Sequence, residues 1–201
     1  MTLSVNEYCD TLHIMVKTKL LLTSLLCVGS YFVAGWSIEL ISLLVLAMLT
    51  MPLVMTDIKE HRLPNSLTLA GFLAGIGVSI IIGISRNSFS PLIHSLSVAL
   101  LAGCTFLLLN LASRGGMGMG DVKLAVMLGA LISPFGWQVL VMGFIVAFVL
   151  GAIFGLILLA SKRANRKTLI PFGPYLLVGA WVSLFIGAEK SQHFINLFRL
   201  N

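Results

Sequence analysis

Long apolar runs separated by short polar breaks dominate the sequence. A helix needs about 20 mostly apolar residues to cross a bilayer core, and all the runs except 122–132 approach or exceed that length. The pattern predicts an all-α integral membrane protein with a bundle of about seven transmembrane helices, or six if the short run does not cross. The runs cover residues 20–36, 38–56, 67–84, 92–112, 122–132, 137–160 and 169–187.

The polar breaks predict where the helices begin and end. Pro64 prevents a helix from running through the loop 57–65, and Asn65 or Ser66 is expected to cap the helix that follows. The sequence Ser-Pro-Phe-Gly at 133–136 is expected to break the chain again. The expected divisions are a polar cytoplasmic lead-in at 1–19, a transmembrane domain at 20–187 and a short amphipathic outer tail at 188–201.

The distribution of Lys and Arg decides whether the short run 122–132 crosses the membrane. If it does, ten of the 13 Lys and Arg residues fall on one side; if it does not, the basic run 162–167 moves to the other side. Cytoplasmic loops carry the excess of positive charge. We therefore expect a crossing, with the N-terminus in the cytoplasm, the C-terminus outside and the protein in the cytoplasmic (inner) membrane.

Composition agrees with this class of protein. The chain is 58% hydrophobic and 10% charged, whereas soluble domains average roughly 45–50% apolar and about 25% charged residues. The net charge of +6 comes from basic residues in short loops, so the expected partner is the lipid bilayer and not nucleic acid. No His, Cys and carboxylate cluster has metal-ligand spacing, so no metal and no cofactor are expected.

Few carboxylates are available for chemistry, and most fall in the N-terminal tail or at the outer rim. Asp57, Glu60 and Asp121 remain at the cytoplasmic rim. Asp57 ends the second apolar run and Asp121 starts the fifth, so the two crossings between them return the chain to the same face. A carboxylate at the edge of a span is energetically unfavourable and suggests a function. The alternative for Asp57 is an ordinary rim residue near Lys59.

A glycine-rich turn leads into Asp121. Gly118 and Gly120 remove side chains beside the carboxylate, which lets an extended substrate strand approach it. The alternative is that these glycines serve close helix packing. Lys123 cannot share the helical face of Asp121, so we expect it to reach the lipid head groups or the substrate.

Three motifs together resemble those of the type IV prepilin and preflagellin peptidases, which are membrane aspartyl proteases with a G-x-G-D motif. The motifs are Asp57 followed by Leu63-Pro64-Asn65, then Gly118-Met-Gly120-Asp121-Val-Lys123, then Pro171-Phe-Gly-Pro174. The resemblance implies that Asp57 and Asp121 are catalytic and that the substrate is a prepilin-like protein cut at the cytoplasmic face. It also implies that the site is shaped by Pro64, Asn65, Gly118, Gly120 and Lys123.

The larger members of that family carry an N-terminal region with paired C-x-x-C motifs and an N-methyltransferase activity. This sequence has no such motifs. It resembles the short type used for Flp/Tad pili, so methylation is not expected. Two other classes stay open: a presenilin-type intramembrane protease and a small proton-coupled transporter that uses the same acids.

The proposed chemistry needs two carboxyl groups that share one proton and hold a water molecule. A helix dipole favours an anion at the helix N-terminus and disfavours one at the C-terminus. Asp121 starts a predicted helix and Asp57 ends one. The expected base is therefore Asp121, and Asp57 is expected to carry the proton.

Overall fold

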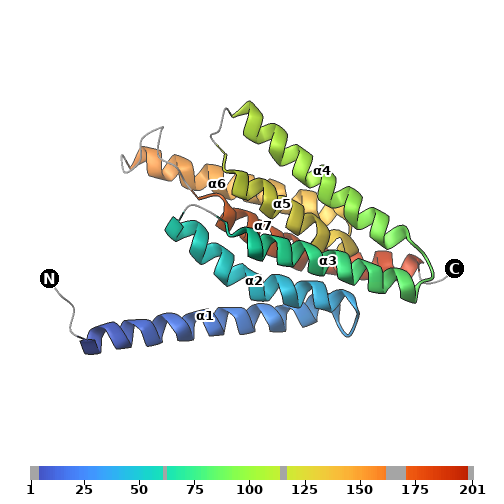
Figure 1. Ribbon diagram of the computed structural model, residues 1–201, viewed down its shortest axis with the longest axis horizontal. Coiled ribbons are helices and arrows are strands. Elements are labelled where there is room, and N and C mark those ends of the chain that lie inside the picture. The colour runs from blue at the N-terminus through green and yellow to red at the C-terminus, as the bar shows by residue number, and fades with distance from the viewer. Residues whose placement is uncertain (1–4, 61–62, 114–116, 162–170, 199–201) are drawn as a thin grey trace.

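The computed structural model is a bundle of α-helices (Figure 1). It describes residues 5–60, 63–113, 117–161 and 171–198. No strand occurs in these ranges, which confirms the predicted all-α class. The helices are α1 (Val5–Ala34), α2 (Glu39–Glu60), α3 (Asn65–Ser85), α4 (Ser90–Ala112), α5 (Met119–Ile132), the short 3-10 helix η1 (Ser133–Phe135), α6 (Trp137–Ala160) and α7 (Gly173–Phe198).

Five of the helices are long and apolar enough to cross a membrane. These are α2, α3, α4 and large parts of α1 and α6. The apolar part of α7 is the shorter stretch Gly173–Gly187. α5 has 14 residues and is therefore about 21 Å long. Seven helices are present in the described residues, as expected for this multispanning architecture.

The shortest of these helices, α5, lies inside the bundle. It packs mainly against α3 and α4, and it also contacts α2, α6 and α7 (Figure 1). All residues from Leu124 to Ile132 except Val126 are buried. The neighbouring helices therefore cover α5 on most sides, so it need not match the thickness of the bilayer by itself.

Glycines allow α3 and α4 to approach α5 closely. A Cβ atom on Gly75 of α3 would lie 2.7 Å from the carbonyl carbon of Ala130 in α5. A Cβ atom on Gly129 of α5 would lie 2.7 Å from Cα of Ala99 in α4. Real Cβ atoms do not approach other atoms this closely, so these contacts require glycine. Small residues at helix contacts are a common way of packing helices in membranes.

Helix ends differ from the predicted limits in three places. α2 continues to Glu60, so Asp57 lies within a helix and not in the loop, because the next helix-breaking residue is Pro64. α1 already begins at Val5, inside the expected lead-in, and the sequence between residues 5 and 28 has no Pro or Gly to stop it. α7 runs without a break past residue 187 to Phe198.

The expected cap of α3 is wrong. The N-cap residue is Pro64, and no side chain makes a capping hydrogen bond there. The three predicted divisions of the chain do not coincide with helix ends and stay a prediction. The basic run 162–167 lies outside the described residues.

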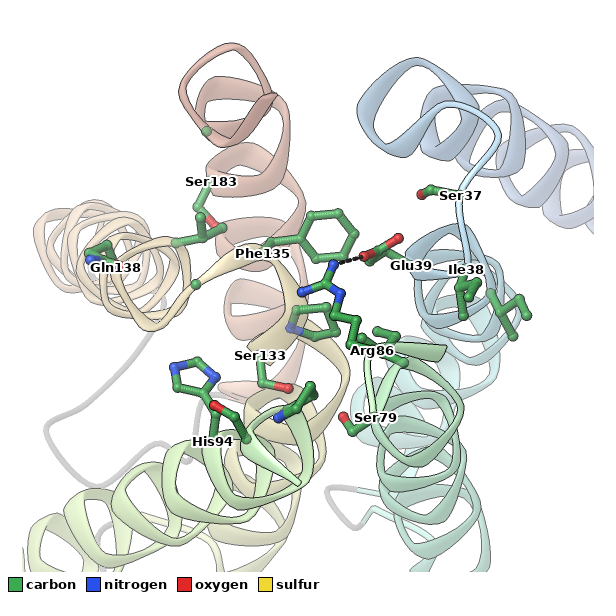
Figure 2. A pocket seen from close by; sticks show the side chains of 18 of the residues that line it. Ser37, Ile38, Glu39, Ser79, Arg86, His94, Ser133, Phe135, Gln138 and Ser183 are labelled. Carbon is green, nitrogen blue, oxygen red and sulfur yellow. Dashed lines mark hydrogen bonds and ion pairs between the residues drawn. The ribbon is translucent and has the colours of Figure 1, made fainter. Parts of the chain in front are cut away.

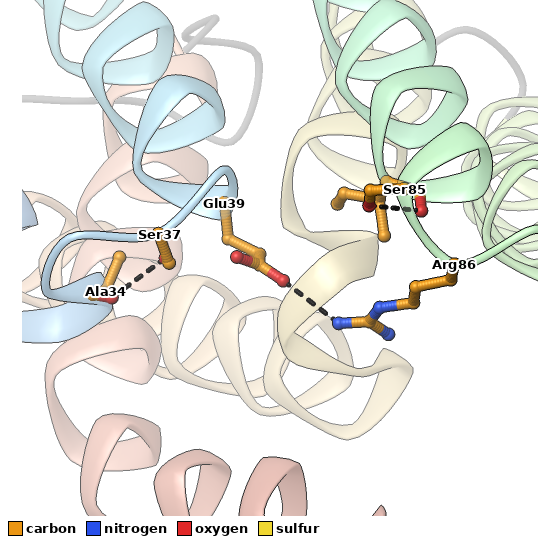
Figure 3. A network of polar contacts seen from close by, with 6 residues as sticks. Ala34, Ser37, Glu39, Ser85 and Arg86 are labelled. Atoms are coloured by element: carbon orange, nitrogen blue, oxygen red, sulfur yellow. Dashed lines mark hydrogen bonds and ion pairs between the residues drawn. The ribbon is translucent and has the colours of Figure 1, made fainter. Parts of the chain in front are cut away.

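The two ends of the bundle carry different polar groups. At one end, the guanidinium of Arg86, directly after α3, lies 3.3 Å from the carboxylate of Glu39 at the start of α2 (Figure 3). Asp57 is 18 residues after Glu39 on α2, which places it about 27 Å away along the helix axis. Asp57 and Asp121 therefore lie at the end opposite to the Glu39–Arg86 ion pair.

Candidate active site

The structure brings Asp57 and Asp121 together at one end of the bundle. Asp57 lies near the end of α2 and Asp121 in the first turn of α5. Their exposed fractions are 5% and 6%, and the two carboxyl groups are close enough to interact electrostatically. Two carboxyl groups that are both buried and adjacent cannot comfortably both be ionised. The pair therefore has the environment that a shared proton requires.

The carboxylate of Asp57 is held by the start of α7. The N–H of Gly173 donates a hydrogen bond of 3.0 Å to Oδ2 of Asp57. Gly173 is the first residue of α7, where backbone N–H groups have no partner within the helix and the dipole favours an anion. The sequence-based assignment compared the helix start at Asp121 with the helix end at Asp57. The start of α7 adds a contact that favours the ionised form of Asp57, so the location of the proton stays a prediction.

A side chain at position 173 would press against the carboxyl group of Asp57. A Cβ atom there would lie 2.6 Å from Oδ2 and 3.1 Å from Cγ of Asp57. Residues 171–174 entered the sequence-based prediction only as part of the family resemblance, and this contact was not predicted. The signal was a glycine directly before a proline at a predicted helix start, where no side chain is available to cap the helix.

An aromatic cluster fixes the residue before Gly173. The ring of Phe172 packs against Phe148 of α6 at a centroid distance of 5.1 Å, and Phe148 stacks on Phe106 of α4 at 5.8 Å. Phe106 is fully buried. These rings connect α4 and α6 to the start of α7, and so they help to hold the Gly173 N–H against Asp57.

The two glycines beside Asp121 differ in their surroundings. A Cβ atom on Gly120 would lie 3.3 Å from the Leu63 side chain, a tight contact that supports the packing interpretation. A Cβ atom on Gly118, the N-cap of α5, would lie 3.6 Å from Oδ2 of Asp121, which is an ordinary contact. The fold therefore has room for a side chain at Gly118. Gly115 and Gly116 lie outside the described residues.

Lys123 and Asn65 join the starts of α5 and α3. Nζ of Lys123 donates a hydrogen bond of 2.7 Å to Oδ1 of Asn65. Lys123 was expected to contact the lipid head groups or the substrate. The hydrogen bond to Asn65 was not expected. This hydrogen bond and the contact between Leu63 and Gly120 attach the segment around Pro64 to the helix that carries Asp121.

A second polar contact joins α2 to α7 deeper in the bundle. Nε1 of Trp181 donates a hydrogen bond of 3.0 Å to Oγ1 of Thr50. Both side chains are buried, with exposed fractions of 5% and 7%. Thr50 is seven residues before Asp57, about two helical turns away on the same face of α2. The Thr50–Trp181 and Asp57–Gly173 hydrogen bonds therefore fix the position of α2 against α7 at two levels.

The described residues contain no group of three or more His, Cys, Asp or Glu side chains that could hold a metal ion.

Comparison with known proteins places these residues in a family. The profile of the "Type IV leader peptidase family" matches residues 40–156, which is more than half of the chain and includes both Asp57 and Asp121. The chain belongs to the type IV leader peptidase family. This confirms the resemblance drawn from the motifs. No solved structure matches the chain significantly.

Relatives within the type IV leader peptidase family are similar over most of this chain. Proteins named "Prepilin leader peptidase/N-methyltransferase" are 32% identical in Stutzerimonas stutzeri, over 98% of this chain and 69% of the relative, and 32% identical in Pseudomonas aeruginosa, over 84% and 56%. The relative of the same name in Xanthomonas campestris pv. campestris is 32% identical over 84% of this chain and 58% of its own length. This chain thus spans less than two thirds of the latter two relatives.

Each of these names includes N-methyltransferase as well as peptidase. The names therefore give no support to the expectation that this member of the family does not methylate.

Proposed function

We propose that this member of the type IV leader peptidase family is an aspartyl endopeptidase that removes the basic leader from prepilin-like proteins. Asp57 and Asp121 are its catalytic residues. The observation that carries the proposal is the convergence of two buried carboxyl groups from helices far apart in the sequence. Family membership supplies the substrate class.

In the proposed reaction, Asp57 is the base and Asp121 carries the proton. The Gly173 N–H supports negative charge on Asp57. Asp121 then keeps its proton, because two adjacent buried carboxyl groups cannot comfortably both be ionised. A water molecule between the two carboxyl groups loses a proton to Asp57 while its oxygen attacks the scissile carbonyl carbon. Asp121 gives its proton to the carbonyl oxygen. The tetrahedral intermediate then loses its C–N bond, and the departing amine takes the proton from Asp57. One hydroxyl group of the intermediate returns a proton to Asp121, which leaves a carboxylic acid product and restores both carboxyl groups.

The substrate strand is proposed to pass Gly118. The fold leaves room for a side chain there, and the next residue, Met119, has an exposed fraction of 54%. An extended backbone needs such an open approach if its carbonyl group is to reach a buried pair of carboxyl groups. Flexible Met side chains adapt to varied apolar segments. This part of the site is therefore proposed to contact the residues around the cleaved bond.

The site is proposed to face the cytoplasm from the inner membrane, with the N-terminus of the chain on the same side. This orientation rests on the distribution of Lys and Arg in the sequence. It places the two carboxyl groups where the basic leader of a prepilin meets its apolar segment.

Cleavage of a prepilin by membranes that contain the protein tests the proposal. Asp57→Asn and Asp121→Asn are compared with wild type, and Glu60→Gln is the matched control because Glu60 is an exposed carboxylate one turn after Asp57. The released leader is identified by mass spectrometry. We expect loss of cleavage in both Asn variants and normal cleavage in Glu60→Gln. Cleavage that persists in either Asn variant contradicts the proposal. The mass of the mature product also shows whether a methyl group has been added.

A further inference from the structure

A large cavity lies at the end of the bundle opposite to Asp57 and Asp121. Its volume is about 1480 Å³. Residues at the starts of α2, α4 and α6 and at the end of α3 line it, together with part of α7 (Figure 2). None of the residues in the proposed proteolytic site is among them. The cavity therefore needs an explanation separate from peptide cleavage.

The short length of α5 creates this cavity. α5 ends at Ile132, and η1 then forms the floor with Ser133 and Phe135, which are both buried. Gly136 has a φ of 101°, which favours glycine, and it turns the chain into α6. α3, α4 and α7 extend past the end of α5 (Figure 1). An opening is left where a full-length central helix would otherwise reach the rim.

The walls of the cavity are amphipathic. Ile41 of α2, Met142 of α6 and Ile186 of α7 are apolar, with exposed fractions of 46%, 45% and 56%. Arg86 and His94 supply polar groups from the ends of α3 and α4 that meet at this rim (Figure 2). A suitable ligand therefore combines an apolar chain with a polar or charged group.

Arg86 indicates the charge of that polar group. The carboxylate of Glu39 lies 3.3 Å from the guanidinium of Arg86. The Glu39 side chain is 12% exposed and the Arg86 side chain is 58% exposed. Arg carries five N–H donors in a planar arrangement, so one bond to Glu39 leaves donors available for a further partner, and Arg86 lines the cavity. Such a guanidinium matches a phosphate group, to which it can donate two parallel hydrogen bonds.

The position of the cavity indicates where the phosphate comes from. The helices that form its walls include α2, α3, α4 and α6, all long and apolar enough to span a membrane, and the cavity is at their ends. Trp36 lines the cavity, and Trp137 stands between Gly136 and Gln138, which both line it. The exposed fractions of Trp36 and Trp137 are 89% and 54%. Exposed Trp residues are typical of the level of the lipid head groups.

We propose that this cavity binds one phospholipid. The phosphate lies at the Arg86 guanidinium, and an acyl chain lies along Ile41, Met142 and Ile186. Glu39 is a positioning residue that holds Arg86 at the mouth of the cavity. The proposal rests on the membrane location of the chain and on these walls, and it does not depend on the proposed proteolysis.

Native mass spectrometry of the purified full-length protein in detergent measures this binding. The probe is phosphatidylethanolamine, titrated to give the fraction of protein with one lipid bound. Diacylglycerol tests the acyl chains without phosphate, and inorganic phosphate tests the anion without chains. We expect one phosphatidylethanolamine to bind more tightly than either comparison compound. Equal binding of diacylglycerol, or equal binding of inorganic phosphate, contradicts the proposal.

Matched variants locate the site. Arg86→Ala is expected to weaken lipid binding roughly tenfold through loss of charge-assisted hydrogen bonds, and Met142→Trp is expected to weaken it by filling the cavity. The controls are Lys17→Ala, which removes an exposed cation from α1, and Met48→Trp, which enlarges a Met with an exposed fraction of 63% outside the cavity. Binding that is unchanged in Arg86→Ala and Met142→Trp, or that falls equally in both controls, overturns the proposal.

Discussion

Replacement of Gly173 by Ala is expected to reduce catalysis without unfolding the protein. The new Cβ atom would lie 2.6 Å from Oδ2 of Asp57, and ordinary contacts begin at 3.4 Å. The carboxylate must therefore retreat by about 0.8 Å, or α7 must shift by a similar amount, and the 3.0 Å hydrogen bond from the Gly173 N–H is distorted in either case. A misplacement of about 1 Å in a catalytic group can reduce the rate about 100-fold, which corresponds to about 2.7 kcal/mol of activation free energy.

The assay is cleavage of a prepilin by purified protein, with kcat and KM measured separately and thermal unfolding measured on the same samples. The kcat value is expected to fall about 100-fold, with a smaller change in KM because substrate binding does not require Asp57 to be correctly placed. Gly77→Ala is the matched control, because a Cβ atom at Gly77 of α3 meets nothing within 4 Å. Gly77→Ala is expected to keep the wild-type kcat and an equal or higher melting temperature.

The reasoning about Gly173 is refuted if Gly173→Ala is folded and cleaves at the wild-type rate. It is also refuted if Gly77→Ala loses activity to the same extent, because the effect then reflects any added methyl group in the bundle and not the contact with Asp57.

Three further substitutions test separate contacts. Trp181→Phe removes the 3.0 Å hydrogen bond to Thr50; calorimetry is expected to show a loss of about 1 kcal/mol, with little further loss when Thr50→Val is added. Gly75→Ala places a Cβ atom 2.7 Å from the Ala130 backbone, so thermal unfolding is expected to show a destabilisation of about 1–3 kcal/mol. In Gly118→Ala the new Cβ atom makes only an ordinary 3.6 Å contact, so the melting temperature is expected to stay unchanged. The kcat/KM value for prepilin is expected to fall, because the methyl group lies on the proposed path of the substrate strand.

The number and approximate limits of the helices were predictable because long apolar runs leave few alternatives. The precise ends were not predictable in the same way. The polar residues of the predicted loop 57–65 indicated a break, yet α2 continues to Glu60 because polar residues alone do not stop a helix. The continuation of α7 past residue 187 has the same cause. Hydropathy indicates the apolar part of a helix, whereas Pro, Gly and tertiary contacts determine its ends.

Part of the candidate site was predictable from parity. Asp57 lies at the end of one apolar run and Asp121 at the start of another, and two crossings lie between them, so the sequence placed both residues at one end of the bundle. Their burial and proximity depend on how α2, α5 and α7 pack, and the sequence pattern does not specify that packing. The Gly173 contact was missed for this reason, and it adds a hydrogen bond that favours the ionised form of Asp57.

Other features depend on tertiary structure alone. Lys123 was expected to contact lipid or substrate, but its partner is Asn65, 58 residues earlier in the sequence. The cavity beyond η1 was also unexpected, although the short run 122–132 was recognised. A short central helix implies an unfilled space only once the surrounding helices are known to extend past it.

The most direct test of the central claim is the kinetics of Asp57→Asn, Asp121→Asn and the double variant on one prepilin substrate. Residues that act as a unit have non-additive effects. Each single variant is expected to lose almost all cleavage, and the double variant is expected to lose no more than the worse single variant. Substantial cleavage by either single variant, or a double variant whose loss is the product of the two single losses, would contradict the claim that Asp57 and Asp121 act together on one water molecule.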